Sequence, residues 1–324
     1  MRENRVEAII ENMEKVVVGK RETIEFAMIT LLAEGHLLLE DVPGMGKTLL
    51  AKTMAQTLGC KFGRIQFTPD TLPGDITGVS VYEMNQGTFR YVPGGIMNQI
   101  VLADEINRAT PKTQASLLEA MAEKQVTVDG RTYPLPAPFM VIATQNPIES
   151  LGTYHLPEAQ LDRFFMKISM GYPGKEEEKN IIKKFLYGEK EKPVESQVTE
   201  ADILKMQKEV KEVWVHPQLV DFILEMAEKT RNHEELILGA SPRAVLAVVR
   251  GAQASAYLEG RKYVIPDDIM KVIYPIWNHR LLLTTEAKMK RLTAQKILLD
   301  IRCKTAMPLV APEMLEEEKM AAWL

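Results

Sequence analysis

A short glycine-containing stretch carries the clearest chemistry in this sequence. Residues 40–48 read Glu-Asp-Val-Pro-Gly-Met-Gly-Lys-Thr, and they follow the apolar run Leu37–Leu39. Backbone N–H groups in such a loop, and at the start of a following helix, can face a phosphate to which Lys47 adds a positive charge. The Thr48 hydroxyl can also ligate Mg²⁺. We therefore predict a nucleotide-binding site at Pro43, Gly44, Met45, Gly46, Lys47, Thr48 and Leu49.

One position departs from the usual phosphate-loop pattern G-x-x-x-x-G-K-[ST]. Asp41 stands where the first glycine of that pattern would be. We expect this residue to be tolerated, because aspartate enters left-handed backbone conformations more readily than most residues. The simpler alternative, a glycine-rich helix entry with a surface lysine, remains open at this point.

Two acidic residues follow 57 residues after Lys47. Asp104 and Glu105 end the apolar run Ile100–Ala103. Ligand sites in open α/β sheets lie beyond the carboxyl ends of the strands. We expect Asp104 to hold Mg²⁺ and Glu105 to activate an attacking water. An acidic turn is the alternative, but the phosphate loop upstream favours catalysis.

Three further polar residues have more than one interpretation. Asn146 ends the apolar run Phe139–Ala143, where its amide could orient the water or contact a γ-phosphate, although an Asn-Pro pair is often only a turn. Arg163 follows a short predicted helix, and Arg243 lies in the first turn of a later one. Each arginine could offset transition-state charge in phosphoryl transfer or lie on the surface. The spacing does not decide between these roles.

The elements around these residues predict an α/β domain followed by a helical one. Five short apolar strands alternate with helices over residues 1–170, which favours a mainly parallel sheet. Helices are expected over residues 3–17 and 21–33, and the turn Val17–Gly19 between them either packs on an adenine ring or simply connects two helices that cover the sheet. Residues 68–78 have loop composition and precede a predicted hairpin.

The remaining segments complete this outline. A second hairpin has a two-residue turn at Asp129-Gly130. A charged linker is expected at residues 188–196, and only helical patterns follow it, the last at about 266–276 and 286–303.

The composition is that of an ordinary globular protein. The chain has 324 residues, a net charge of −4 and a pI near 5.9, so the whole chain lacks the basic character expected for binding nucleic acid or an anionic membrane. The two cysteines, Cys60 and Cys303, argue against a disulfide framework or a zinc site. No apolar run approaches the ~20 residues of a membrane span, and the N-terminus is unlike a signal peptide. We expect a cytoplasmic protein without membrane insertion.

The motifs together resemble those of the MoxR family of AAA+ ATPases over about residues 1–285. They occur in the order found in that family, at residues 40–48, 103–109 (Ala-Asp-Glu-Ile-Asn-Arg-Ala), 143–147 (Ala-Thr-Gln-Asn-Pro), 156–164 (Leu-Pro-Glu-Ala-Gln-Leu-Asp-Arg-Phe) and 239–244 (Gly-Ala-Ser-Pro-Arg-Ala).

This resemblance implies a fold and a domain division. The fold would be a P-loop AAA+ core, an αβα sandwich with a mainly parallel five-stranded sheet, followed by a C-terminal all-helical lid. The core would cover residues 1–188 and the lid residues 197–303, with a tail at 304–324. The core would contain a helix-2-type insert at about 68–92 and a pre-sensor hairpin at about 125–136, both lining a pore or facing a client.

The resemblance also implies an activity and residue roles. The chain would hydrolyse ATP to ADP with Mg²⁺ in a homo-oligomeric ring, usually a hexamer, with nucleotide between subunits. Asn146 would be the first sensor, Arg163 the finger given to the neighbouring subunit, and Arg243 the second sensor acting in cis. Lys47, Thr48, Asp104 and Glu105 would keep the roles given above, Gly19 would belong to the nucleotide site, and Arg108 could be a second interface residue.

The resemblance also implies a partner, and rival functions stand beside it. The client would be a protein, for example one with a von Willebrand factor A domain, which the ring would remodel as a chaperone. A nucleic-acid-stimulated AAA+ motor is the alternative, although residues 125–136 offer only one arginine and one tyrosine. A nucleotide-gated scaffold with little turnover is a second alternative, and a kinase is disfavoured because no acceptor-binding domain is predicted. Nucleic acid is thus not an expected partner.

Overall fold

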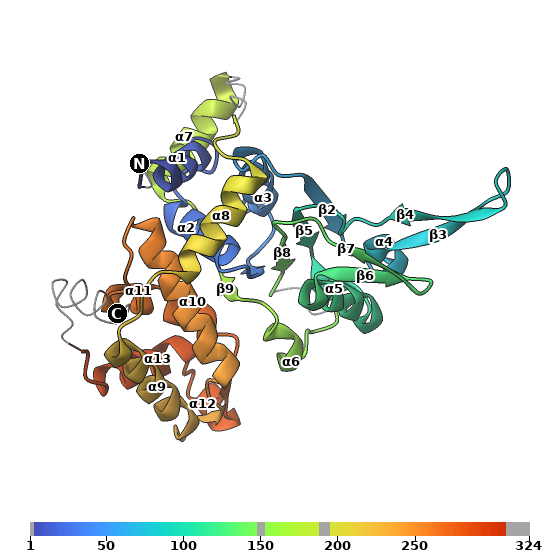
Figure 1. Ribbon diagram of the computed structural model, residues 1–324. Helices are drawn as coiled ribbons and strands as arrows, with labels where there is room; N and C mark the ends of the chain where they lie inside the picture. Colours follow the sequence, from blue (N-terminus) through green and yellow to red (C-terminus); the bar gives the residue numbers. More distant parts are fainter. Residues whose placement is uncertain (1–2, 148–152, 188–194, 309–324) are drawn as a thin grey trace, which may run out of the picture.

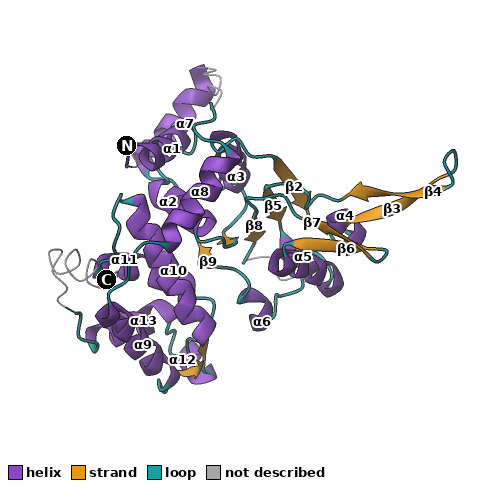
Figure 2. Ribbon diagram, in the orientation of Figure 1, coloured by secondary structure: helices purple, strands orange, loops and turns teal. Residues whose placement is uncertain are grey.

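A parallel sheet forms the centre of the N-terminal half of the chain (Figures 1 and 2). The computed structural model describes residues 3–147, 153–187 and 195–308. All neighbouring strands in the sheet pair in parallel. Their order is β2 (Phe62–Gln66), β5 (Ile100–Asp104), β8 (Met140–Gln145), β1 (Leu37–Glu40) and β9 (Met166–Ile168). The expected five-stranded parallel sheet is therefore confirmed.

Helices cover both faces of this sheet because its apolar side chains point alternately to the two sides. Leu37 and Leu39 join one apolar cluster, whereas Leu38 joins the other. The first cluster is covered by α1 (Glu3–Glu14), α2 (Arg21–Leu32) and α3 (Lys47–Thr57). The second is covered by α4 (Pro73–Thr77), the 3₁₀ turn η1 (Ile106–Arg108) and α5 (Pro111–Glu123). This arrangement is the expected αβα sandwich.

Two hairpins extend from the sandwich. They are β3 (Gly78–Glu83) with β4 (Thr88–Pro93), and β6 (Gln125–Val128) with β7 (Arg131–Pro134). The β3–β4 hairpin projects far beyond the rest of the molecule (Figure 1). Tyr91 and Tyr133 stack with ring centroids 4.0 Å apart, so the two hairpins touch. The loop expected at 68–78 contains α4, in which Pro73 opens the helix and Asp75 accepts the Leu72 N–H at 2.8 Å.

Helices dominate the rest of the chain. The elements are α6 (Glu158–Leu161), α7 (Lys175–Tyr187), α8 (Glu200–Lys211), α9 (Pro217–Arg231), β10 (Leu236–Leu238), α10 (Pro242–Leu258), α11 (Pro266–Trp277), β11 (Leu282–Leu283), α12 (Thr285–Met289) and α13 (Ala294–Cys303). One apolar cluster runs from the sheet into α8–α11 and α13, so the sheet and the helical part share a core. Among the described residues, no helix is both long and apolar enough to cross a bilayer.

The structure differs from the expected elements in three places. β10 and β11 pair antiparallel where only helices were expected. The helix expected at 286–303 is two helices, because Arg291 takes a left-handed conformation (φ 55°) and Thr293 caps α13. The helix α7 had no counterpart among the expected elements. Most of the expected linker (188–194) and most of the tail (309–324) lie outside the described residues.

A buried histidine before β1 should make stability depend on pH. The ring of His36 accepts the Val141 N–H through Nδ1 at 3.0 Å. Burial lowers the pKa of His36 from 6.5 to about 4. As the pH is lowered from 6.5 to 4, the unfolded chain therefore binds a proton on His36 that the folded chain does not bind. The free energy of unfolding falls as the pH is lowered through this window. We expect a loss of about 3 kcal/mol, since one pKa unit is about 1.4 kcal/mol.

Urea unfolding at several pH values checks this. His36→Gln should have a flatter pH dependence than wild type, whereas His155→Gln, at an exposed position, should not. Identical slopes for wild type and His36→Gln would contradict the assignment.

Candidate active site

The loop between β1 and α3 forms an open anion cradle. Gly44 and Gly46 have φ of 86° and 83°, and a Cβ at either position would meet no described atom within 4 Å. Gly46 precedes α3, whose start is not capped by a side chain among the described residues. The first N–H groups of a helix without such a cap are available to an anion. Lys47 Nζ donates to the Asp41 carbonyl at 2.7 Å, so the lysine lies along the same loop.

Asp41 has a different role from the one expected. Its backbone is not among those with positive φ, so the expectation of a left-handed residue was wrong. Instead, its buried carboxylate accepts from Ser169 Oγ at 2.5 Å, the Met170 N–H at 2.7 Å and the Gly171 N–H at 3.3 Å. A glycine could not make these bonds. The aspartate thus ties the phosphate loop to the segment after β9.

Asp104 lies at the carboxyl end of β5, on the same edge of the sheet as the phosphate loop. Its Oδ1 accepts from Thr144 Oγ1 at 2.7 Å, and its Oδ2 accepts from Arg64 Nη2 at 2.7 Å. β5 and β1 are separated only by β8, so their ends are about 10 Å apart at the usual ~4.8 Å strand spacing. That separation suits a triphosphate with a metal ion between loop and acid.

Glu105 is held beside Asp104 in a strained backbone conformation. Its φ is 58°, and its N–H donates to Thr144 Oγ1 at 2.8 Å. Its Oε2 accepts from Gln66 Nε2 at 2.9 Å and from Arg108 Nη1 at 3.1 Å. Both bonds end on Oε2, and a carboxylate has further acceptor sites on Oε1.

Sequence reasoning missed three of the residues that hold these acids. They are Arg64, Gln66 and Thr144. A signal was present, because Gln66 and Thr144 are polar residues at the carboxyl ends of β2 and β8. In a parallel sheet such residues gather at one edge. Arg108, a possible interface residue from the sequence, contacts the candidate base within this chain, and its interface role stays a prediction.

Asn146 lies at the carboxyl edge of the sheet with the phosphate loop and the two acids, which we call the phosphate edge, and Gly19 lies in the turn before α2. Asn146 is buried directly after β8, in which Gln145 pairs with Glu40 of β1. Gly19 has φ 69° and precedes α2, and a Cβ there would collide with the Glu177 side chain at 2.0 Å. The next residue, Lys20, donates to the carbonyls of residues 170–172 at 2.7 to 3.0 Å, the segment to which Asp41 binds. A contact of Gly19 with an adenine ring stays a prediction.

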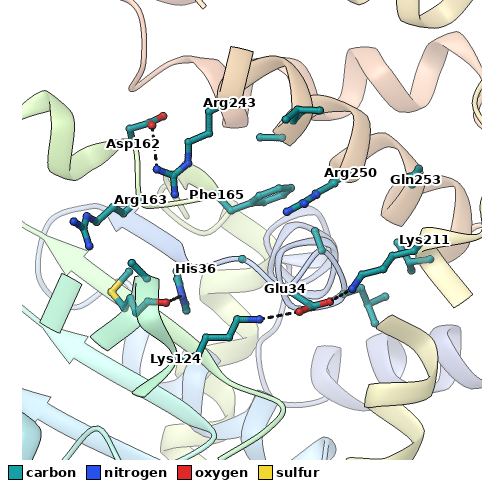
Figure 3. A pocket seen from close by; sticks show the side chains of 18 of the residues that line it. Glu34, His36, Lys124, Asp162, Arg163, Phe165, Lys211, Arg243, Arg250 and Gln253 are labelled. Carbon is teal, nitrogen blue, oxygen red and sulfur yellow. Dashed lines mark hydrogen bonds and ion pairs between the residues drawn. The ribbon is translucent and has the colours of Figure 1, made fainter. Parts of the chain in front are cut away.

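The two arginines lie near the opposite edge of the sheet, Arg163 just before β9 and Arg243 at the start of α10. Arg163 precedes β9, which runs parallel to β1, and therefore sits at the amino edge. Arg163 and Arg243 line one cavity of about 730 Å³ between this edge and the helical part (Figure 3). Arg163 donates to the Leu118 carbonyl at 2.6 Å, and Arg243 lies 3.6 Å from Asp162.

This placement separates the predicted site residues into two groups. The described residues of the phosphate loop do not line the cavity that contains the two arginines. β1 alone, at four residues, separates the edges by about 13 Å. The structure thus brings Arg163 and Arg243 to each other and not to the phosphate loop of the same chain. The expected cis role of Arg243 does not match this geometry.

Comparisons with known proteins find matching family models, relatives and a solved structure. The family model described as "ATPase family associated with various cellular activities (AAA)" matches residues 36–166, and an AAA lid domain model matches residues 228–301. The uncharacterised protein YeaC of Bacillus subtilis is 47% identical over 92% of this chain and 93% of its own length. Chaperone MoxR1 of Mycobacterium tuberculosis is 40% identical, over 94% of this chain and 83% of its own. A solved structure from Cytophaga hutchinsonii, assigned as an ATPase, superimposes with a TM-score of 0.89 at 39% identity, covering 95% of this chain and 96% of its own.

Proposed function

This chain belongs to the MoxR family of AAA+ ATPases, and we propose that it hydrolyses ATP to ADP and phosphate with Mg²⁺ in a ring of identical subunits, a hexamer. The ring would use that energy to remodel a protein client. The observation that carries this proposal is one sheet edge that combines an open glycine cradle with Asp104 and Glu105. We further propose that residues 1–188 form the core and residues 197–303 the lid.

The residues of the phosphate edge would divide the chemistry. The N–H groups at the start of α3 and the Lys47 ammonium would bind the terminal phosphates. Glu105 would take the proton of the attacking water, which Asn146 would orient. Thr48 and Asp104 would hold Mg²⁺, which supplies positive charge against the phosphate oxygens when bound.

We propose that both arginines act on the nucleotide of the neighbouring subunit. Arg163 lies at the amino edge of the sheet, and Arg243 lines the same cavity from the start of α10, so neither shares a cavity with its own phosphate loop. In a ring, the amino edge of one subunit would face the carboxyl edge of the next. Arg163 and Arg243 would then both offset charge in trans, and a single subunit would have an incomplete site.

The projecting hairpin favours a protein client over nucleic acid. Exposed apolar side chains dominate β3–β4 and its tip, namely Val79, Val81, Tyr82, Met84, Phe89 and Val92. The basic residue Arg90 pairs with Glu83, and Tyr133 of the other hairpin stacks on Tyr91. A nucleic-acid motor would instead need unpaired basic and aromatic residues there. A client with a von Willebrand factor A domain rests on the family resemblance. A cytoplasmic location rests on the two free thiols, Cys60 and Cys303.

Phosphate release measured against protein concentration tests the proposal. If sites are shared between subunits, activity per mole should rise with concentration as rings form. Single- or double-stranded DNA should not stimulate it. Constant activity per mole across the range in which rings assemble would contradict a shared site.

Lys47→Ala should weaken ATP binding about 10- to 100-fold, because a charge-assisted hydrogen bond contributes about 1.5 to 3 kcal/mol. Titration with a fluorescent ATP analogue measures this. Lys52→Ala removes an exposed lysine from the same helix and should bind as wild type does. Equal affinities of wild type and Lys47→Ala for ATP would contradict the assignment of residues 43–49 as the phosphate loop.

A further inference from the structure

An ion pair between a buried arginine and a partly buried aspartate joins the lid to the residue before Arg163. Arg280 lies between α11 and β11, and its side chain is only 5% exposed. Its Nε donates to Asp162 Oδ1 at 2.7 Å. The two residues are 118 positions apart in the chain.

The same lid segment also fixes the backbone on both sides of Arg163. Arg280 donates to the carbonyls of Asp162 at 3.3 Å, Phe164 at 2.8 Å and Phe165 at 3.2 Å, and to that of Ile276 in α11 at 2.5 Å. His279 adds a hydrogen bond between Nε2 and the Phe164 carbonyl at 3.0 Å. Residues 162, 164 and 165 are therefore held by the lid, and Arg163 lies between them.

Asp162 contacts a second lid arginine as well. Its Oδ2 lies 3.6 Å from Nη1 of Arg243, the first-turn residue of α10 (Figure 3). Arg243 is largely exposed, so this carboxylate restrains a side chain that would otherwise be free to rotate in solvent. The Asp162 carboxylate thus adjoins two arginines of the helical part, Arg280 and Arg243.

The stability of the folded chain alone does not explain why Arg280 and Asp162 form an ion pair here. Burying the Arg280 guanidinium, which is only 5% exposed, costs several kcal/mol of hydration, so the ion pair contributes little net stability. The bonds of Arg280 are instead concentrated on the backbone around Arg163. A forked guanidinium can fix several acceptors at once, which suits a geometric role.

We propose that Asp162 and Arg280 are positioning residues that direct Arg163 and Arg243 toward the nucleotide of the neighbouring subunit. They would couple the position of the lid to both arginines, since α11 packs against β9 and contributes the Ile276 carbonyl. This inference rests on the shared site proposed above.

Two variants test the positioning role. Asp162→Asn removes the charge without changing the shape of the side chain, and Arg280→Lys keeps the charge but loses the fork, so it stays informative if the first variant folds poorly. Each should lower kcat about 100-fold, the loss expected when a catalytic group is misplaced by about 1 Å. The Kd for ATP should be unchanged, because the phosphate loop of the same subunit is intact.

Mixing two inactive variants in one ring distinguishes a positioning role from a general loss of folding. Glu105→Gln subunits lack the proposed base but keep both arginines. Mixed with Asp162→Asn subunits, they should form composite sites in which the phosphate edge of one variant meets the arginines of the other, and activity should partly recover. Arg163→Ala mixed in the same way is the positive control.

A matched ion pair in the lid provides the structural control. Arg261 and Asp268 form two hydrogen bonds of 2.6 and 2.7 Å, and Asp268 is buried, yet the pair does not contact residues 162–165. Asp268→Asn should lower the midpoint of urea unfolding and leave the turnover of folded protein unchanged.

Wild-type turnover in folded Asp162→Asn and Arg280→Lys would overturn the positioning role. The role would also be overturned if mixing with Glu105→Gln subunits restored the activity of Arg163→Ala but not that of Asp162→Asn. If Arg163→Ala itself is not restored in mixed rings, the shared site fails, and the positioning role fails with it.

Discussion

Arg163→Ala should lower ATP turnover by about 10³- to 10⁵-fold, the range found for arginines that offset transition-state charge in phosphoryl transfer. The reason is geometric as well as electrostatic. The arginine lies at the amino edge of the sheet, so its charge would be missing from the neighbouring site and not from its own. ATP binding to the variant should therefore persist. Steady-state phosphate release and titration with labelled ATP measure the two effects separately.

A mixing experiment shows whether this arginine acts in trans. Arg163→Ala and Glu105→Gln are each expected to be inactive alone and partly active together, because some interfaces would pair an intact Glu105 with an intact Arg163. Arg302→Ala, at an exposed position on α13, is the matched control and should keep full activity. An absence of recovery in rings shown to contain both variants would argue against the trans role.

Glu105→Gln should keep ATP binding and lower turnover by about 10²- to 10⁴-fold, the usual contribution of a general base. Glutamine has nearly the same shape and can still accept the hydrogen bonds of Gln66 and Arg108, but it cannot take a proton from water. Single-turnover phosphate release, started with Mg²⁺ after ATP has bound, isolates the chemical step.

Glu119→Gln removes an exposed carboxylate from α5 and should behave as wild type. If Glu105→Gln hydrolyses ATP at the wild-type rate, another group activates the water. The nucleotide-gated scaffold is then also excluded, because both proteins would hydrolyse ATP at a measurable rate. A wild-type chain that binds ATP and releases no phosphate at any concentration would instead favour the scaffold.

Local patterns predicted most elements of the sandwich. β1, β5 and β8 are continuous apolar runs, and the Asp129-Gly130 turn of the second hairpin has the two positive φ values that such turns require. Long-range pairing was not predictable in the same way. β10 and β11 lie more than 40 residues apart, and nothing local separates their short leucine runs from a helix.

The sequence by itself determined the phosphate cradle and its acids, because each follows one strand directly and a parallel sheet must gather those strand ends at one edge. Only the tertiary structure decided which side of the sheet each arginine occupies, what Asp41 binds, and that Arg280 holds Asp162. These contacts join residues more than 100 positions apart. Their geometry depends on how the lid packs on the sheet, and no spacing within one segment carries that information.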